Sequence, residues 1–329
     1  MHSIIRSMLG LWMEEEIRQQ PEVLARGANN YMSSLMPVLK DRKFDMVLLA
    51  ARGSSDNAAL FGRYLIEVFL GIPVSLAAPS VLTRYHRHVQ YTNCLAIGIS
   101  QSGAAPDISE ILGALRSEGH TTLAITNTPN SRVTQEAEHT LLLDAGMEQS
   151  VAATKTYTAS LLALYEVVRA LGGELPSPAG LLPDAAWVET ARIAASEASG
   201  SFVRNSPTFS LGRGFGFSTA QETALKLMEC ALLPCKSYSS ADFEHGPKAL
   251  AGHGSTAVSF DGPMPELAAQ GCEIVVAPEA STTSSDGVDK ILNPIWDIIY
   301  GQWLALLCAR ARGLNPDVPQ HIRKVTQTL

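Results

Sequence analysis

The stretch AIGISQSGAAPD, residues 96–107, decides the prediction of the fold. Its apolar first half is typical of a buried strand, and it breaks abruptly into the polar letters SQSG at residues 100–103. After the break, apolar side chains recur at helical spacing at Ile108, Ile111 and Leu115. A strand, a polar loop and an amphipathic helix in this order indicate one unit of a parallel sheet, and a small polar group is expected to bind at the break.

The same alternation extends along the chain. Apolar runs typical of strands lie at residues 46–51, 74–78, 95–99, 122–126, 140–143 and 208–211, and their rhythm returns at 257–262. Helical patterns lie at residues 14–36 (broken at Pro21), 58–68, 108–115, 157–171, 185–200, 220–232 and 295–312. Continuous apolar strands alternating with helices predict an α/β fold with parallel sheets covered on both faces, and the return of the pattern indicates a weak internal duplication.

The bulk composition sets limits on the class of protein. A chain of 329 residues is long enough for two domains, and a net charge of −7 argues against a general binder of nucleic acid or of anionic membranes. Five scattered cysteines without C-x-x-C spacing predict no zinc site or disulfide framework and fit a reducing cytoplasm. Residues 1–13 lack the features of a signal peptide, and no segment approaches the roughly 20 apolar residues of a membrane span.

Two serine-rich loops are the candidate ligand site. Gly53-Ser54-Ser55 and Ser100-Gln101-Ser102-Gly103 each follow an expected strand and precede an expected helix. Free N–H groups, the helix dipole and serine hydroxyls together favour a phosphate there. The alternative, that the serines only cap helices, stays open for either loop taken alone. Neither loop matches the patterns for ATP or dinucleotides, so a sugar phosphate fits better. Asp261 follows the equivalent strand of the second copy, where its charge would repel an anion.

With these loops in view, the sequence resembles the isomerase half of glucosamine-6-phosphate synthase, which is built from two sugar isomerase (SIS) domains. The motifs that carry the resemblance are RGSS at 52–55, ISQSG at 99–103, VAATK at 151–155, ETALKLME at 222–229, EHGP at 244–247 and the segment 319–324. The resemblance implies two SIS domains, each a doubly wound, mostly parallel sheet between layers of helices. The expected division is a helical leader at 1–36, SIS domains at 37–173 and 201–313, a linker and helix at 174–200 between them, and a tail at 314–329 over the active site.

The sequence also departs from that family. No glutaminase domain precedes the isomerase-like part, and His2 stands where the synthase carries a catalytic cysteine, so release of ammonia from glutamine is not expected. Ala105 and Ala153 stand where the family commonly has a hydroxyl, which removes two donors from the sugar pocket.

The charged residues of the second half have two interpretations. Glu222, Lys226 and Glu229 share one helix face by their spacing, whereas Leu225, Met228 and Leu232 occupy another. From the residues alone, a solvated row of salt bridges is the more common interpretation. The resemblance instead implies that Glu229 moves a proton between C1 and C2 of an open-chain sugar while Lys226 balances charge.

The resemblance assigns the remaining roles. His245, supplied by the neighbouring subunit of a homodimer, would open the sugar ring, and Lys324 would form a Schiff base with a ketose carbonyl. The implied substrate-binding residues are Ser54, Ser55, Ser100, Gln101, Ser102, Ala153, Thr154 and Lys155. No metal and no other cofactor is expected.

The function predicted from the sequence is that of an amino-sugar-phosphate deaminase and isomerase acting on glucosamine 6-phosphate or a close relative. Two alternatives remain open from the sequence: a deglycase of sugar-amine phosphates, and a sugar-phosphate sensor without chemistry. The sequence does not distinguish gluco from galacto stereochemistry.

Overall fold

The computed structural model describes residues 8–279, 288–319 and 321–324. Its described residues divide into two compact units. The N-terminal unit holds residues 22–147 and 156–179, and the C-terminal unit holds residues 8–21, 148–155 and 180–324 with the gaps just given. The predicted tail at 314–329 is thus described only in part, and so is the predicted leader at 1–36. Each unit is described by itself below.

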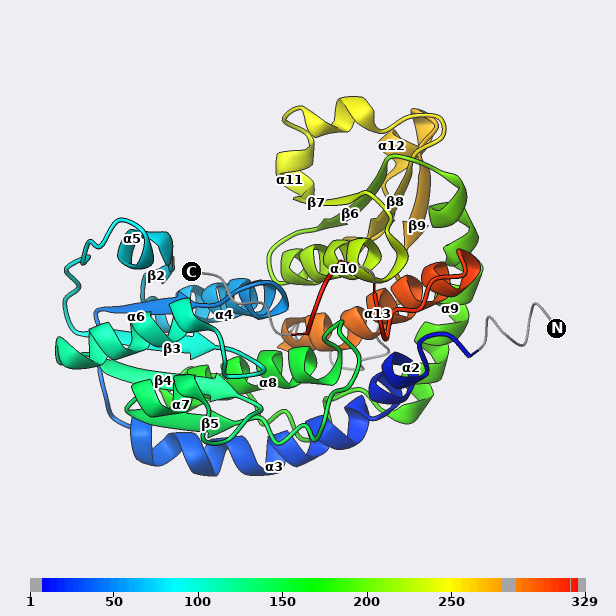
Figure 1. Cartoon of the computed structure of the whole chain (residues 1–329). Helices are drawn as coiled ribbons and strands as arrows, with labels where there is room; N and C mark the ends of the chain where they lie inside the picture. Colours follow the sequence, from blue (N-terminus) through cyan, green and yellow to red (C-terminus); the bar gives the residue numbers. More distant parts are fainter. Residues whose placement is uncertain (1–7, 280–287, 320, 325–329) are drawn as a thin grey trace. The chain divides into compact units, whose positions relative to one another are not determined.

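The N-terminal unit is built on a five-stranded parallel sheet (Figure 1). Its strands are β1 (Met46–Ala50), β2 (Val74–Leu76), β3 (Cys94–Ile99), β4 (Thr121–Thr126) and β5 (His139–Leu142), in the order β2-β1-β3-β4-β5. Its helices are α3 (Gln20–Leu39), α4 (Ser54–Leu70), α5 (Ser80–Thr83), α6 (Pro106–Ser117), α7 (Arg132–Glu136) and α8 (Lys155–Ala170). Because right-handed crossovers leave β1 and β3 in opposite directions, α4 and α6 cover opposite faces of a doubly wound sheet.

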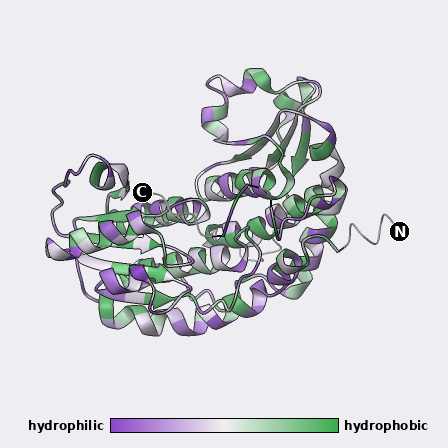
Figure 2. Cartoon of the chain, in the orientation of Figure 1, coloured by the Kyte–Doolittle hydropathy of each residue, from purple (hydrophilic) through white to green (hydrophobic). Residues whose placement is uncertain are grey.

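Close packing fixes the position of α6 on this sheet. Gly98 in β3 faces Leu112 of α6, and a Cβ added to the glycine would come within 2.6 Å of that leucine. Ile108 and Leu112 are fully buried in the same cluster. The strands of this sheet are among the most hydrophobic parts of the chain (Figure 2). The helix is therefore held rigidly, and so is the SQSG loop that leads into it.

The C-terminal unit has its own parallel sheet, in the order β7-β6-β8-β9. The strands are β6 (Thr208–Gly212), β7 (Cys235–Ser239), β8 (Thr256–Ser259) and β9 (Glu273–Val276). The helical segments are α2 (Leu11–Arg18), α9 (Ala185–Arg204), α10 (Gly216–Ala231), α11 (Ser240–Phe243), α12 (Pro265–Ala269), α13 (Asn293–Ala311) and the short 3₁₀ turns η1 (Pro247–Leu250) and η2 (Val288–Leu292). Two doubly wound parallel sheets confirm the predicted fold class.

Helix α13 corrects one expectation from the sequence. Among the described residues, the segment Lys290–Ala311 is the one helical stretch that is long and apolar enough to cross a membrane, judged by length and composition. The expectation that no segment approaches this length is therefore wrong. Asp297 and Gln302 break the continuous apolar run, but the mean hydropathy of the segment is still high enough for a membrane span. In the structure, 83% of the segment's apolar window is buried inside the protein, as for a core helix.

Candidate active site

The serine-rich loops of the N-terminal unit lie where a doubly wound sheet binds its ligands. Sequence order reverses between β1 and β3, which are neighbours in the sheet, and crevices form beyond the carboxyl ends of such strands. Ser54 and Ser55 open α4 directly after β1, and Ser100 directly follows β3. The structure therefore brings Ser54, Ser55, Ser100, Gln101 and Ser102 to one edge of one sheet.

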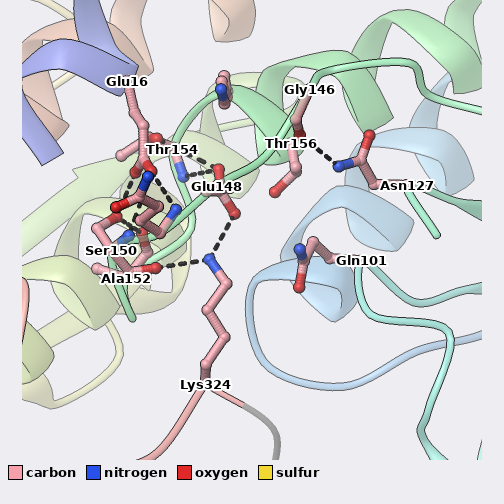
Figure 3. Close-up of polar contacts among 12 residues, drawn as sticks. Glu16, Gln101, Asn127, Gly146, Glu148, Ser150, Ala152, Thr154, Thr156 and Lys324 are labelled. Atoms are coloured by element: carbon pink, nitrogen blue, oxygen red, sulfur yellow. Dashed lines mark hydrogen bonds and ion pairs between the residues drawn. The ribbon is translucent and has the colours of Figure 1, made fainter. Parts of the chain in front are cut away.

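The SQSG loop is held in place by the end of β4 and the segment that follows it. The carbonyl oxygen of Gln101 accepts hydrogen bonds from Thr126 Oγ1 at 3.3 Å, from Asn127 N at 3.2 Å and from Thr128 Oγ1 at 3.3 Å. The same segment is braced further along, where the Asn127 side chain donates to the carbonyl oxygen of Gly146 at 2.8 Å (Figure 3). These contacts fix the backbone of the loop before any ligand binds.

Gly103 is the most restrictive position of the loop. Its φ of +64° is in the left-handed region, and an added Cβ would lie 2.0 Å from Ser131 Oγ. Gly103→Ala is therefore expected to shift the loop, lower the free energy of unfolding by about 1 to 3 kcal/mol and weaken phosphate binding. Urea unfolding and calorimetric titration measure the two effects. Gly119→Ala is the matched control, since its φ is +87° but nothing lies within 4 Å of its added Cβ. Equal binding losses in both variants would contradict the steric argument.

The start of α6 offers fewer free N–H groups than the sequence predicted. Ala104 N already donates to Ser102 Oγ at 3.3 Å, and Ile108 N donates to Asp107 Oδ1 at 3.0 Å. Pro106, the first residue of the helix, has no N–H group. This corrects the expectation that the start of α6 supplies several backbone donors to a phosphate. Side chains must supply more of the donors.

The corresponding edge of the second sheet is occupied by a carboxylate. Asp261 follows β8 and accepts hydrogen bonds from the backbone N of Arg213, at 3.0 Å, and from Ser240 Oγ. These donors come from the segments after β6 and β7, so the side chain of Asp261 satisfies the groups that an anion would otherwise use. An anion site is therefore not expected at this second edge.

Helix α10 carries a buried ionic triad. Lys226 Nζ lies 2.5 Å from Glu229 Oε2 and 3.4 Å from Glu222 Oε1. The side chains of Glu222 and Lys226 are fully buried, whereas 27% of the Glu229 side chain is exposed. Burial alone would lower the pKa of Lys226, but the two carboxylates outweigh this effect and raise it. The interpretation as a solvated row of salt bridges is therefore wrong.

One apolar row of α10, which ends at Met228 and Leu232, is exposed, whereas the row that includes Leu227 packs into the core. Met228 is 43% exposed and Leu232 is 46% exposed, although both are hydrophobic. Glu229, by contrast, is a partly exposed carboxylate held next to a buried ammonium group. This arrangement suits an acid–base group that must reach a substrate and yet stay fixed in position.

The segment 148–155 and Lys324 form a second buried polar cluster (Figure 3). Lys324 Nζ lies 3.2 Å from Glu148 Oε2 and donates to the carbonyl oxygen of Ser150 at 2.5 Å. Glu148 also accepts from Thr154 N at 3.0 Å and from Thr154 Oγ1 at 3.3 Å. Glu16 accepts from Ser150 Oγ at 2.5 Å, and burial raises the pKa of its carboxyl group despite that bond.

This cluster determines the surroundings of three residues that the resemblance assigned to the substrate. Thr154 is fully buried with its hydroxyl directed to Glu148, and Lys155 Nζ contacts Gln19 Oε1 at 2.7 Å. Ala153 is half-buried. Glu16 and Glu148 did not figure in the prediction, because single acidic residues outside a motif give no signal in a sequence.

His245 lies apart from Glu229 within the C-terminal unit. Helix α10 runs antiparallel to the strands, so Glu229, near its end, lies toward the amino edge of the sheet. His245 follows β7 and α11 beyond the carboxyl edge of the sheet and is exposed. Glu229 lies thirteen positions after Gly216, the first residue of α10, which is about 20 Å along the helix axis. One C-terminal unit therefore does not bring these two groups together.

The predicted site residues are thus divided between the units. The serines and Gln101 belong to the N-terminal unit, and Ala153, Thr154, Lys155, Lys226, Glu229, His245 and Lys324 belong to the C-terminal unit. Within the described ranges, no group of three or more His, Cys, Asp or Glu side chains is arranged to hold a metal ion.

Comparisons with known proteins show what this chain is similar to. Residues 42–169 match the SIS domain family. The chain is 32% identical to a glutamine–fructose-6-phosphate aminotransferase (isomerizing) from Methanothermobacter thermautotrophicus, over 95% of the chain and 57% of that protein. The chain therefore spans just over half the length of this curated relative. The predicted resemblance to SIS proteins is confirmed.

Two solved structures show the same fold. The C-terminal domain of glucosamine-fructose-6-phosphate aminotransferase from Francisella tularensis superimposes with a TM-score of 0.80 at 25% identity, over 94% of this chain and 98% of that one. Glucosamine-6-phosphate deaminase from Thermotoga maritima gives a TM-score of 0.80 at 23% identity, over 96% of this chain and all of that one. At that identity, the second likeness concerns the fold alone.

Proposed function

Since this chain contains a SIS domain and resembles the isomerase half of glutamine–fructose-6-phosphate aminotransferase, we propose that it is an amino-sugar-phosphate deaminase and isomerase. The substrate is glucosamine 6-phosphate or a close relative, and the products are fructose 6-phosphate and ammonia. The observation that carries the proposal is the partly exposed Glu229 carboxylate fixed 2.5 Å from the buried Lys226 ammonium group.

The reaction would proceed by proton transfer along the open-chain sugar. His245 takes the proton from O1 and gives one to O5, which opens the ring. Glu229 removes the proton from C2, which gives an enolamine. Glu229 then returns the proton to C1, which turns the enolamine into an imine at C2. Water adds to this imine and ammonia leaves, which gives the ketose. Lys226 stabilises the charge of Glu229, and the serine-rich loops hold the phosphate.

Lys324 has a different role in this proposal from the Schiff base that the resemblance implies. An ammonium group paired with Glu148 is not a nucleophile, and a substrate that already carries an amine needs no covalent attachment. Lys324 would then anchor the described end of the tail on residues 148–150. Asp317 supports this path, since its carboxylate accepts hydrogen bonds from the N-terminal N–H groups of α2, at 3.0 Å from Trp12 and 2.9 Å from Met13.

The proposal includes a homodimer in which each site uses His245 of the partner subunit. The separation of Glu229 and His245 within one C-terminal unit supports this arrangement. The exposed apolar side chains of Met228 and Leu232 support it too, since such side chains are commonly covered in an assembly.

Mixing two inactive variants tests the shared site. Glu229→Gln and His245→Asn are each expected to be inactive alone. After the subunits are exchanged in a mixture, half of the dimers are hybrids with one intact site of two, so about a quarter of the wild-type activity should return. Two copies of Glu229→Gln tagged differently serve as the control. No recovery, with hybrid dimers shown by mass spectrometry, would rule out the shared site.

A substrate panel tests the reaction itself. Glucosamine 6-phosphate, galactosamine 6-phosphate and a fructosamine 6-phosphate with a larger amine are each assayed for free amine and for ketose 6-phosphate. Ammonia from a hexosamine 6-phosphate supports the deaminase, and release of the larger amine alone supports a deglycase instead. Binding without any product supports a sugar-phosphate sensor, and absence of binding refutes the proposed substrate class.

A further inference from the structure

We propose that Arg52 is a phosphate-binding residue whose guanidinium group, anchored on Asp107, adds a positive charge to the serine-rich loops. This inference rests on the proposed sugar-phosphate substrate and adds a charged residue to two loops whose other predicted ligand residues are neutral. Arg52 directly precedes Gly53 and the first turn of α4.

The register of the sheet places Arg52 beside the SQSG loop. Ala50 of β1 pairs with Gly98 of β3, and Arg52 and Ser100 each follow two residues later. Neighbouring strands are about 4.8 Å apart, so the two residues start from adjacent positions at the same edge. This edge, between β1 and β3, is where the order of strands reverses.

An ion pair holds the guanidinium group of Arg52 across this edge. Arg52 Nε lies 2.7 Å from Oδ2 of Asp107, which belongs to the first turn of α6. The arginine side chain thus extends from the end of β1 to the start of the helix that follows the SQSG loop. It is 49% exposed, whereas the aspartate is 2% exposed. The terminal nitrogens Nη1 and Nη2 make no further hydrogen bond to the part of the chain that the structure describes, and they form the fork that suits a phosphate.

The charges favour an anion only because Arg52 is present. The Asp107 carboxylate lies at the start of α6, where it would repel a phosphate. Arg52 neutralises it, and because the carboxylate is buried and the guanidinium exposed, the positive end of the pair faces outward. Arg52 also acts on Asp56, where burial raises the pKa of the carboxyl group and the arginine opposes that shift. Arg52 further compensates for the backbone donors that α6 lacks and for the hydroxyl absent at Ala105.

Calorimetric titration with glucitol 6-phosphate, an unreactive open-chain hexose phosphate, tests this role. Arg52→Gln is expected to weaken binding about tenfold, the size of one lost charge-assisted hydrogen bond, and Arg52→Lys by less. Arg63→Gln is the matched control. Arg63 lies on α4, is 46% exposed and pairs with Glu67 at 3.1 Å, but it points to no predicted ligand residue. The affinity of Arg63→Gln for glucitol 6-phosphate should equal that of the wild type.

A second variant separates the effect of Arg52 on binding from its effect on stability. Arg52→Gln removes the positive charge beside the buried Asp107 carboxylate, so the thermal unfolding of this variant must be compared with that of Arg52→Gln/Asp107→Asn. The double variant should regain stability and still bind about tenfold more weakly. Wild-type affinity in the double variant would overturn the role of Arg52. Failure of the wild-type chain to bind glucitol 6-phosphate at all would overturn it together with the proposed substrate class.

Discussion

Replacement of Glu229 by glutamine is expected to lower the turnover of glucosamine 6-phosphate by a factor of about 10² to 10⁴. Glutamine keeps the shape of the side chain but cannot accept the C2 proton. Ammonia release measures the loss. Calorimetry should show unchanged affinity for glucitol 6-phosphate, because the phosphate is assigned to residues of the N-terminal unit.

Glu222 provides the matched control for this prediction. It also lies against Lys226, at 3.4 Å, but its side chain is fully buried, so it is not placed to contact a substrate. Glu222→Gln removes the same charge from the lysine and should lower stability while it changes turnover far less than Glu229→Gln. Near wild-type turnover in Glu229→Gln, or an equal loss in both variants, would show that Glu229 is not the proton-transfer group.

The first sheet was predictable because its strands are buried on both faces. All six residues of β3 and the last five of β4 are buried, and a strand of this kind appears in the sequence as a continuous apolar run. The break between the two N-terminal helices was predictable as well: α2 ends at Arg18 and α3 begins at Gln20, next to Pro21. The SQSG loop could be placed at a strand end for the same reason.

The edge strands of the second sheet were not predicted. β7 has the sequence CKSYS and only its first residue is buried, and β9 has no buried residue. Both lie at the edges of the sheet, where one side is open, so no apolar run marks them. Their positions depend on pairing with β6 and β8, which a local pattern does not contain.

The site was predictable only in part, because its geometry depends on contacts distant in sequence. Spacing placed Glu222, Lys226 and Glu229 on one face of a helix but gave no sign that this face is the buried one. Glu148 and Lys324 are 176 positions apart and yet form an ion pair. Arg52 and Asp107 are separated by 55 positions and meet because β1 and β3 are neighbours.

Replacement of Lys226 by methionine is expected to destabilise the protein by about 3 to 5 kcal/mol. Methionine fills a similar volume, but the Glu222 and Glu229 carboxylates lose the ammonium group between them, and Glu222 is fully buried. Urea unfolding at pH 7 measures the loss. Lys248→Met is the matched control, because Lys248 also lies between two carboxylates, at 2.7 Å from Glu244 and 2.8 Å from Glu266, but both are exposed. Little change is expected there.

The dependence on pH separates this charge effect from a simple packing defect. In the wild-type chain, the pKa of Lys226 is higher in the folded state than the value of about 10.4 for a lysine in an unfolded chain. The stabilising contribution of Lys226 is therefore fully present below about pH 10.4 and is lost only as the pH rises through the pKa of the folded state. Its contribution is therefore constant between pH 5 and 8. In Lys226→Met, a buried carboxyl group can take up a proton instead, so the deficit relative to wild type should shrink as the pH falls from 8 to 5. A deficit that is the same at both pH values would assign the loss to packing and refute the role of the triad.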